Sequence, residues 1–303
     1  MENNYVKRLF SHIEKHHPQF LRGVEEARAK SPVDFDFLAN QYLEWAAGVL
    51  EKDTLKRTVK AYIQFTTEVN LAQAQYEVDG HYKYKSFKEV YQIHYDDDEL
   101  MNDYLWGVYL TNFLWAHHLE ICQFYKNRFL SRIEKSSNLI EIAPGHGGWG
   151  VWALKELPQA SLSGFDVSSS SIKISSSLAI AAGVDKRVVY NQQNAMDIDP
   201  QSTPHCDGLI CSFLLEHLED PNALFGIINQ LIKPGGVAFI TGALTAAQID
   251  HIYEFKKESE LVLMAESNGL RVLESISTNP ERLLNKAKYV PRSMALIVQN
   301  SRA

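Results

Sequence analysis

The chain of 303 residues lacks any apolar run that approaches the ~20 residues needed to span a bilayer. Its first twenty residues, MENNYVKRLFSHIEKHHPQF, alternate charged with apolar side chains. A signal peptide has a continuous apolar segment, so we expect none here. Long runs of lysine or arginine are also missing, and the formal net charge is -7. Nucleic-acid binders usually carry a basic patch, so the sequence predicts neither a nucleic-acid nor a membrane partner.

Cysteine is scarce. Cys122, Cys206 and Cys211 have no C-x-x-C spacing and lie in apolar segments. Such residues are typical of buried free thiols in a reducing compartment, and we therefore expect a cytoplasmic protein. The cysteines and histidines also lack the spacing of a metal-binding motif, so no metal is predicted.

Proline and glycine are sparse in the first part of the chain, where no proline stands between Pro32 and Pro144. Apolar residues recur there at intervals of three and four, for example from Phe35 to Ile63. This period is that of an amphipathic helix, and Asp34 and Asp53 are candidate helix caps. We predict an all-helical cap domain over residues 1–130.

A long helix is expected at the end of this region, from about Glu99 to Phe129. Asp96, Asp97 and Asp98 precede it and can cap its first turn. Apolar residues spread around most of its circumference, which indicates burial on more than one side. We therefore expect this helix between the helical cap and the domain that follows.

From Asn138 onward, short β-rich segments alternate with helical ones. Seven strands are predicted, at 139–143, 161–167, 187–192, 207–213, 236–244, 272–277 and 294–299. Helical patterns cover 151–157, 171–182, 222–232 and 248–267. Such alternation is typical of a mainly parallel sheet with helices on both faces. Residues 131–303 are thus predicted to form an α/β domain.

Glycines cluster directly after the first of these strands, at Gly145, Gly147 and Gly150. Glycines at a strand-to-helix turn let the backbone approach a ligand closely and direct helix N–H groups at it. The three also satisfy the G-x-G-x-x-G pattern, and Asp166 lies about twenty residues on, as in dinucleotide-binding proteins. The loop alone therefore leaves an NAD(P)-dependent dehydrogenase open.

Further residues distinguish between the classes of protein that carry such a glycine loop. Glu141 gives E-x-x-x-G-x-G, Asp166 ends the second strand in GFDVS, and Asn194-Ala195-Met196 follows the third strand. LEHLEDP follows the fourth strand, and LIKPGG precedes the fifth. In this order, the set resembles the class I S-adenosylmethionine-dependent methyltransferases.

The resemblance implies a Rossmann-like seven-stranded sheet whose last strand is antiparallel and lies between the fifth and the sixth. Tyr289 and Arg292 would then lie at the rim of the active site. It also implies a set of residues that bind S-adenosylmethionine. For the methionine part these are Gly145, Gly147 and Ser212, together with Glu141, which would hold either the glycine loop or the methionine amine. For the ribose and adenine they are Asp166, Val167, Asn194, Ala195 and Met196. The chain departs from the usual family pattern at Pro144, His146 and Asn194.

Methyl transfer from a sulfonium is an in-line displacement, in which alignment alone can supply ~7–11 kcal/mol. A general base is needed only when the acceptor loses a proton. His217, in the loop after the fourth strand, and His146, in the glycine loop, are the candidate catalytic residues. For both, a structural role in packing or loop geometry stays open.

The function predicted is methyl transfer to an oxygen, nitrogen or carbon of a small metabolite. The alternatives are the dehydrogenase and a non-catalytic cofactor-binding subunit, and a homodimer is compatible with the apolar helical region. An aromatic set could line the acceptor pocket or form the core of the helical cap. Its members are Tyr82, Tyr84, Tyr95, Tyr104, Trp106, Tyr109 and Trp115.

Overall fold

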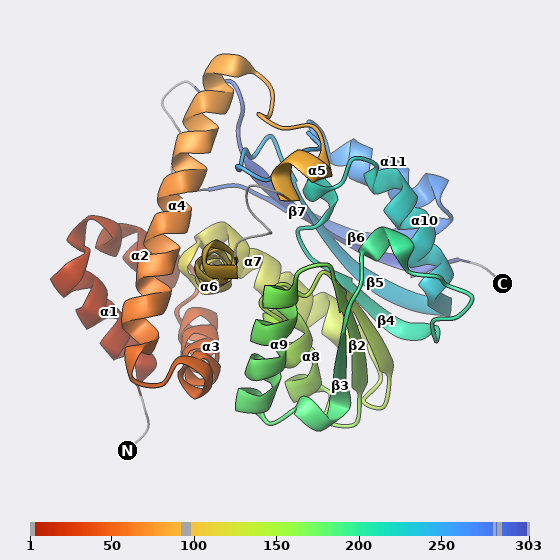
Figure 1. Ribbon diagram of the computed structural model, residues 1–303, viewed down its shortest axis with the longest axis horizontal. Coiled ribbons are helices and arrows are strands. Elements are labelled where there is room, and N and C mark those ends of the chain that lie inside the picture. The colour runs from red at the N-terminus through yellow and green to blue at the C-terminus, as the bar shows by residue number, and fades with distance from the viewer. Residues whose placement is uncertain (1–3, 92–97, 281–282, 284–286, 302–303) are drawn as a thin grey trace.

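The computed structural model describes residues 4–91, 98–280, 283 and 287–301 (Figure 1). Tyr95, Asp96 and Asp97, for which the sequence suggests roles, lie outside the described residues. Within the described residues, no helix is both long and apolar enough to cross a membrane.

The first part of the chain is helical, as predicted. Its α-helices are α1 (Tyr5–His16), α2 (Pro18–Lys30), α3 (Pro32–Leu50), α4 (Thr54–Asp79), α5 (Phe87–Val90), α6 (Asp98–Leu114) and α7 (Ala116–Phe124). Pro18 and Pro32 are the first residues of α2 and α3. At this position a backbone N–H would have no acceptor within the helix, so proline loses no hydrogen bond there.

The predictions of the two helix caps are less accurate than those of the helices themselves. Ser31, not Asp34, holds the N-cap position of α3, and Asp34 lies in the first turn, where it accepts a hydrogen bond from the Ser31 hydroxyl. Asp53 does hold the N-cap position of α4, but its side chain makes no capping bond.

The prediction of one continuous helix over 99–129 is wrong. Trp115 is extended, with φ -102° and ψ 119°, and separates α6 from α7. A π-helical turn (Tyr125–Phe129) and a 3-10 turn (Leu130–Arg132) then follow α7. Neither proline nor glycine marks the break, so the sequence carries no local signal for it. The break coincides with tertiary packing of the Trp115 ring, which lies against Phe65 of α4 and stacks on His117.

All seven predicted strands are present. They are β1 (Asn138–Ile142), β2 (Ser161–Asp166), β3 (Val188–Gln192), β4 (Cys206–Cys211), β5 (Ile232–Leu244), β6 (Leu270–Thr278) and β7 (Arg292–Asn300). Their order is β3-β2-β1-β4-β5-β7-β6, and β1 to β5 pair in parallel. Strand β7 is antiparallel to both β5 and β6, which confirms the predicted Rossmann-like sheet.

The helices of the α/β part are α8 (Gly148–Glu156), α9 (Ser169–Ala182), α10 (Pro221–Leu231) and α11 (Glu258–Ser267). The helix predicted over 248–267 is therefore wrong in its first half. Residues 245–257, here called the β5–α11 loop, form no helix, and several of their backbone N–H groups donate to acceptors outside a helical turn. The N–H groups of Ile252 and Tyr253 donate to the carbonyl of Glu216, and that of Thr245 donates to the carbonyl of Phe255.

The two parts of the chain share a hydrophobic core. Figure 1 shows α1 to α4 on one side of the molecule, the sheet on the other, and α6 and α7 between them. One cluster of buried side chains includes Tyr42 and Trp106 of the helices together with Trp152 and Phe239 of the α/β part. All three cysteines are buried and free, as predicted.

Candidate functional site

A cavity of about 960 Å³ opens at the carboxyl ends of the strands, between the sheet and the helices. Residues that follow β1 to β5 line it, and α4 and α6 cover it from the other side. The strand order reverses between β1 and β4, and ligands of open α/β sheets bind at such a switch point. The topology therefore places a ligand site here.

Asp166, at the end of β2, joins two of the loops at this edge. Its Oδ2 accepts from the N–H of Gly145 at 3.0 Å, and its Oδ1 accepts from the N–H of Ser168 at 2.9 Å. Burial raises the pKa of Asp166 to about 6, although these N–H groups favour the charged form. The carboxylate lines the cavity, where its remaining lone pairs can accept hydrogen bonds from hydroxyl groups of a ligand.

Glu141 lies in the middle of β1, beneath the glycine loop. Its Oε1 accepts from the N–H of Gly150 at 3.1 Å, whereas its Oε2 has no hydrogen-bond partner within the described residues. Burial raises the pKa of this carboxyl to about 8. Glu141 is not among the described residues that line the cavity. Of its two predicted roles, the geometry favours holding the loop.

The two predicted loop glycines differ in position. Gly145 has φ +52° and lines the cavity. Gly147 has φ +75°, and a Cβ placed there would lie 2.6 Å from Cβ of Ser175 in α9. The absence of a side chain at Gly147 thus serves the close packing of the loop on α9.

His146 lines the cavity between these glycines. Its Nδ1 accepts from the N–H of Gly148 at 2.9 Å, and its Nε2 lies 3.4 Å from the amide of Asn112. Burial lowers the pKa of His146 to about 3, so the ring is neutral. These contacts fix the loop, and a catalytic role for His146 stays a prediction.

The remaining predicted cofactor residues also line the cavity: Val167, Asn194, Ala195, Met196 and Ser212. Oδ1 of Asn194 accepts from the N–H of Met196 at 3.0 Å and so caps the short turn after β3. The Ser212 hydroxyl is 3.2 Å from Oγ1 of Thr241 on β5.

Among the described residues, three of the four non-glycine residues with a positive φ follow strands at the cavity edge of the sheet, and the fourth, Glu51, ends α3. Ala143, Phe213 and Thr245 have φ values of 51°, 51° and 47°, and they follow β1, β4 and β5 within two residues. A positive φ is unfavourable for residues other than glycine and is common at functional sites. The pattern was not evident from the sequence, because none of the three is a glycine.

Aromatic and histidine side chains form much of the helical wall. Of the predicted aromatic set, Tyr104 and Trp115 line the cavity, whereas Tyr82, Trp106 and Tyr109 are buried in packing. His118 also lines it, with its ring stacked on Phe213 at 5.0 Å between centroids. These rings give the cavity apolar surface opposite the strand ends, where polar side chains such as Thr66 and Asn70 also line it.

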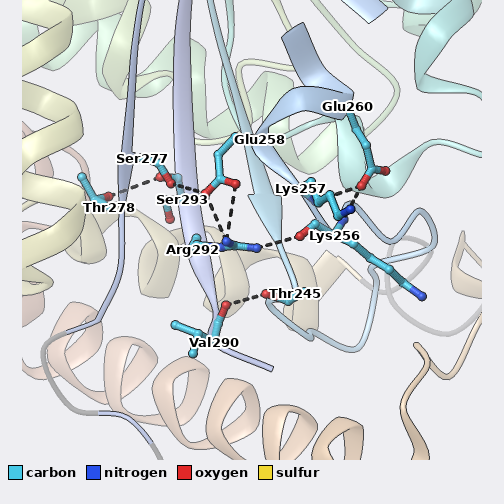
Figure 2. Close-up of polar contacts among 10 residues, drawn as sticks. All are labelled: Thr245, Lys256, Lys257, Glu258, Glu260, Ser277, Thr278, Val290, Arg292 and Ser293. Carbon is cyan, nitrogen blue, oxygen red and sulfur yellow. Dashed lines mark hydrogen bonds and ion pairs between the residues drawn. The ribbon is translucent and has the colours of Figure 1, made fainter. Parts of the chain in front are cut away.

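Tyr289 and Arg292 line the cavity, as the resemblance predicts for its rim. Figure 2 shows how Arg292 holds the rim together: it pairs with Glu258 at 3.2 Å and donates to the carbonyl of Lys256 at 2.7 Å. The Thr245 hydroxyl donates to the carbonyl of Val290 in the same group. These contacts fasten the β5–α11 loop to the start of β7.

The structure also assembles a group of side chains that sequence spacing does not reveal. Glu216 and His217 lie in the 3-10 turn after β4, and His251 lies in the β5–α11 loop. One potential ligand atom from each lies within 4.8 Å of the others, and all three residues line the cavity. The sequence-based expectation of no metal rested on local spacing, and this group comes together only through the fold.

Comparison with known proteins agrees with this architecture. A family model described as "Methyltransferase domain" matches residues 115–275, more than half of the chain. The chain therefore belongs to the class I S-adenosylmethionine-dependent methyltransferases, and S-adenosylmethionine is the cofactor. This family membership excludes the dehydrogenase alternative.

Curated relatives are ubiquinone biosynthesis O-methyltransferases. The one from Xanthomonas axonopodis pv. citri (strain 306) is 26% identical over 153 residues, which cover 44% of this chain and 63% of the relative. That from Bordetella avium (strain 197N) is 29% identical over 130 residues, covering 37% of this chain and 53% of the relative. The match thus spans less than two thirds of either relative.

Solved structures share the fold. A putative sarcosine dimethylglycine methyltransferase from Galdieria sulphuraria matches with a TM-score of 0.52 and 11% identity, over 61% of this chain and 86% of that one. Geranyl diphosphate C-methyltransferase from Streptomyces coelicolor A3(2) matches with a TM-score of 0.50 and 14% identity, over 64% of this chain and 84% of that one. At these identities the likeness concerns the fold alone.

Proposed function

We propose that this chain transfers the methyl group of S-adenosylmethionine to an oxygen of a small molecule bound in the cavity. The observation that carries the proposal is that one cavity contains both the predicted cofactor residues and a separate wall from the helices with aromatic side chains. Its volume of about 960 Å³ is at the upper end of the usual range for ligand pockets, ~300–1,000 Å³. A cofactor and an acceptor can therefore lie side by side.

The cofactor half is assigned to the strand ends. Asp166 would accept the ribose hydroxyls, with Val167, Asn194, Ala195 and Met196 around the adenine. Gly145 and Ser212 would contact the methionine part, with Glu141 and Gly147 supporting the loop from behind. In support, seven of these nine residues line the cavity. Of the other two, Glu141 accepts from the N–H of Gly150, and Gly147 packs the loop against α9.

The acceptor half is assigned to the helical wall. Tyr104, Trp115 and His118 offer aromatic surfaces there, which suits a ring or another apolar group. Helices α4 and α6 cover the cavity, which favours a small acceptor over a protein. Oxygen is proposed as the methylated atom because the curated relatives are O-methyltransferases.

The direct test is turnover. The chain is incubated with S-adenosylmethionine and a panel of hydroxylated metabolites, and mass spectrometry follows S-adenosylhomocysteine together with products heavier by one methylene. We expect both to form in equal amounts. Tight cofactor binding without turnover on any hydroxyl, amine or carbon acceptor would instead support the non-catalytic alternative.

A further inference from the structure

Glu216 is a buried carboxyl group that lines the cavity beside His217 and near the backbone N–H of Ala243, but its hydrogen bonding is incomplete. The residue is 0% exposed, and neither Oε1 nor Oε2 accepts a well-formed hydrogen bond within the described residues. Taking a carboxylate out of water without a donor or a cation is strongly unfavourable. The position is therefore suited to a positively charged ligand.

The two histidines beside it have their ring nitrogens oriented by acceptors. Nδ1 of His217 lies 3.1 Å from the carbonyl oxygen of Asp250, and Nδ1 of His251 lies 2.7 Å from the carbonyl oxygen of Ala246. A carbonyl only accepts, so Nδ1 carries the proton in both rings and Nε2 carries the lone pair. Histidines that bind metals show this arrangement, in which the second nitrogen donates to a carbonyl or a carboxylate.

The histidine rings are also close and firmly placed. Their centroids are 4.9 Å apart with the planes at 90°. The carboxylate of Asp250, itself 0% exposed, lies 3.4 Å from Nδ1 of His217.

Residues of the N-terminal part, in α4 and just after it, hold the loop that carries His251. Gln73 of α4 donates to the carbonyl of Thr245 at 3.2 Å and accepts from the N–H of Ala247 at 2.8 Å. The Tyr82 hydroxyl donates to the carbonyl of Ala246 at 3.0 Å. Such support from surrounding residues is what fixes the geometry of a metal site.

We propose that Glu216, His217 and His251 bind one divalent transition-metal ion in the cavity, and that the acceptor coordinates this ion through the oxygen that is methylated. Two imidazoles and one carboxylate suit Zn²⁺ or a similar ion, whereas Mg²⁺ and Ca²⁺ prefer oxygen ligands. Three protein ligands leave a coordination position for the acceptor.

The second half of this inference rests on the proposed methyl transfer. A bound metal ion lowers the pKa of a coordinated water to about 7, and it lowers the pKa of a coordinated hydroxyl acceptor in the same way. The hydroxyl proton passes to solvent, and the oxygen then forms a bond to the methyl carbon. The sulfur–methyl bond breaks, and its electron pair stays on sulfur to give neutral S-adenosylhomocysteine. His217 is in this case a ligand and not a general base.

Metal binding can be measured without cofactor, acceptor or turnover. The chain has a second histidine group at its N-terminus, where the ring centroids of His12, His16 and His17 are 4.8 to 6.4 Å apart. Every sample, free of any histidine tag, therefore carries glutamine at these three positions. After treatment with a chelator, the chain is titrated with Zn²⁺ by calorimetry and with Co²⁺ by visible absorption.

We expect one ion per chain and a Co²⁺ spectrum typical of nitrogen and oxygen ligands. Glu216→Gln and His251→Gln should each weaken binding more than a hundredfold, because loss of a supporting residue alone costs about 10–100-fold. Asp250→Asn should fall within that lower range. His205→Ala, at an exposed histidine outside the cavity, is the matched control and should bind as the parent does.

The affinity for S-adenosylmethionine is measured on the same samples. It tests the proposed methyl transfer separately from the metal site, and it also shows whether each variant is folded. If the parent binds the cofactor but shows no saturable metal binding, the metal site is wrong while the cofactor assignment stands. Equal metal binding in the parent and in a folded His251→Gln variant would overturn it as well. If the metal binds as expected but the cofactor does not, the proposed function fails and the metal site remains. Should Glu216→Gln not fold, His251→Gln decides.

Discussion

Asp166 connects the loop after β1, the loop after β2 and the proposed ribose site through a single carboxylate. Two backbone N–H groups hold it at the cavity wall, and burial brings its pKa to about 6. Because only the charged form offers all of its lone pairs to hydroxyl groups, the same side chain couples cofactor binding to pH.

The affinity for S-adenosylmethionine should therefore fall as the pH drops from about 7.5 to about 5, when Asp166 becomes protonated. Hydrogen bonds to a charged group are worth about 1.5–3 kcal/mol each. Asp166→Asn should thus bind the cofactor about ten- to several-hundred-fold more weakly at pH 7.5, with little further change on acidification. Calorimetry at both pH values measures this. Asp199→Asn, an exposed aspartate, is the control, and an Asp166→Asn variant that keeps the parent's pH dependence would contradict the assignment.

Glu141 should make the fold less stable at alkaline pH. Its pKa is about 8 in the folded chain, against an ordinary value of 4.5. The folded state therefore holds this proton more tightly, and the resulting stabilisation is complete below about pH 4.5 and lost as the pH rises through about 8. At one pKa unit per ~1.4 kcal/mol, the loss is on the order of a few kcal/mol.

Urea unfolding at pH 6.5 and 8.5 tests this, because Asp166 is largely ionised over that interval. The free energy of unfolding of the parent should decrease between the two values, and Glu141→Gln should remove most of the decrease. Glu266→Gln, at an exposed position on α11, should keep the parent's slope. Equal slopes in all three chains would mean that Glu141 is ionised in the folded state.

At the scale of elements, the turn between β1 and α8 depends on close packing against α9. Gly147 and Gly183 share a left-handed backbone, with φ +75° and +70°. They differ in surroundings: a Cβ at Gly183 would meet nothing within 4 Å, whereas a Cβ at Gly147 would lie 2.6 Å from the Cβ and 2.9 Å from the Cα of Ser175. An alanine at Gly183 would therefore introduce backbone strain alone, whereas an alanine at Gly147 would add steric overlap with α9.

Gly183→Ala should lower the free energy of unfolding by about 1–2 kcal/mol, the cost of a left-handed residue. Gly147→Ala adds overpacking, which typically costs about 1–3 kcal/mol, and should also weaken cofactor binding because the loop must move. Urea unfolding and cofactor calorimetry on both variants measure the two effects. Equal destabilisation would show that the loop and α9 separate easily.

The sequence was most informative about elements with a clear period or a marked turn. All seven strands were predicted, because alternating β-rich and helical segments are local signals, whereas the reversed final hairpin was predicted only from the resemblance to the methyltransferase family. The break at Trp115 and the β5–α11 loop were missed, since tertiary contacts determine both. The group of Glu216, His217 and His251 was missed for the same reason: α10 and β5 intervene between the latter two residues.

At the scale of the whole molecule, the helical and α/β parts meet through aromatic packing. Tyr125, just after α7, packs on Trp149 and on Phe239 at 4.9 Å in both cases, and its hydroxyl donates to the carbonyl of Trp149 at 3.0 Å. Gln73 and Tyr82 contact the β5–α11 loop from the helical side. The boundary predicted near residue 130 therefore crosses a continuous core.

We accordingly expect residues 1–130 and 131–303 to unfold together. A calorimetric scan should show one transition, and limited proteolysis should release no stable fragment of either part. S-adenosylmethionine at a hundredfold excess over its Kd should add about 2.7 kcal/mol of stability and raise the single midpoint by a few degrees. Tyr125→Ala should lower the same midpoint without splitting it, because the side chain belongs to both halves of the core. Two transitions, of which only one responds to the cofactor, would instead establish the helical cap and the cofactor-binding part as independent domains.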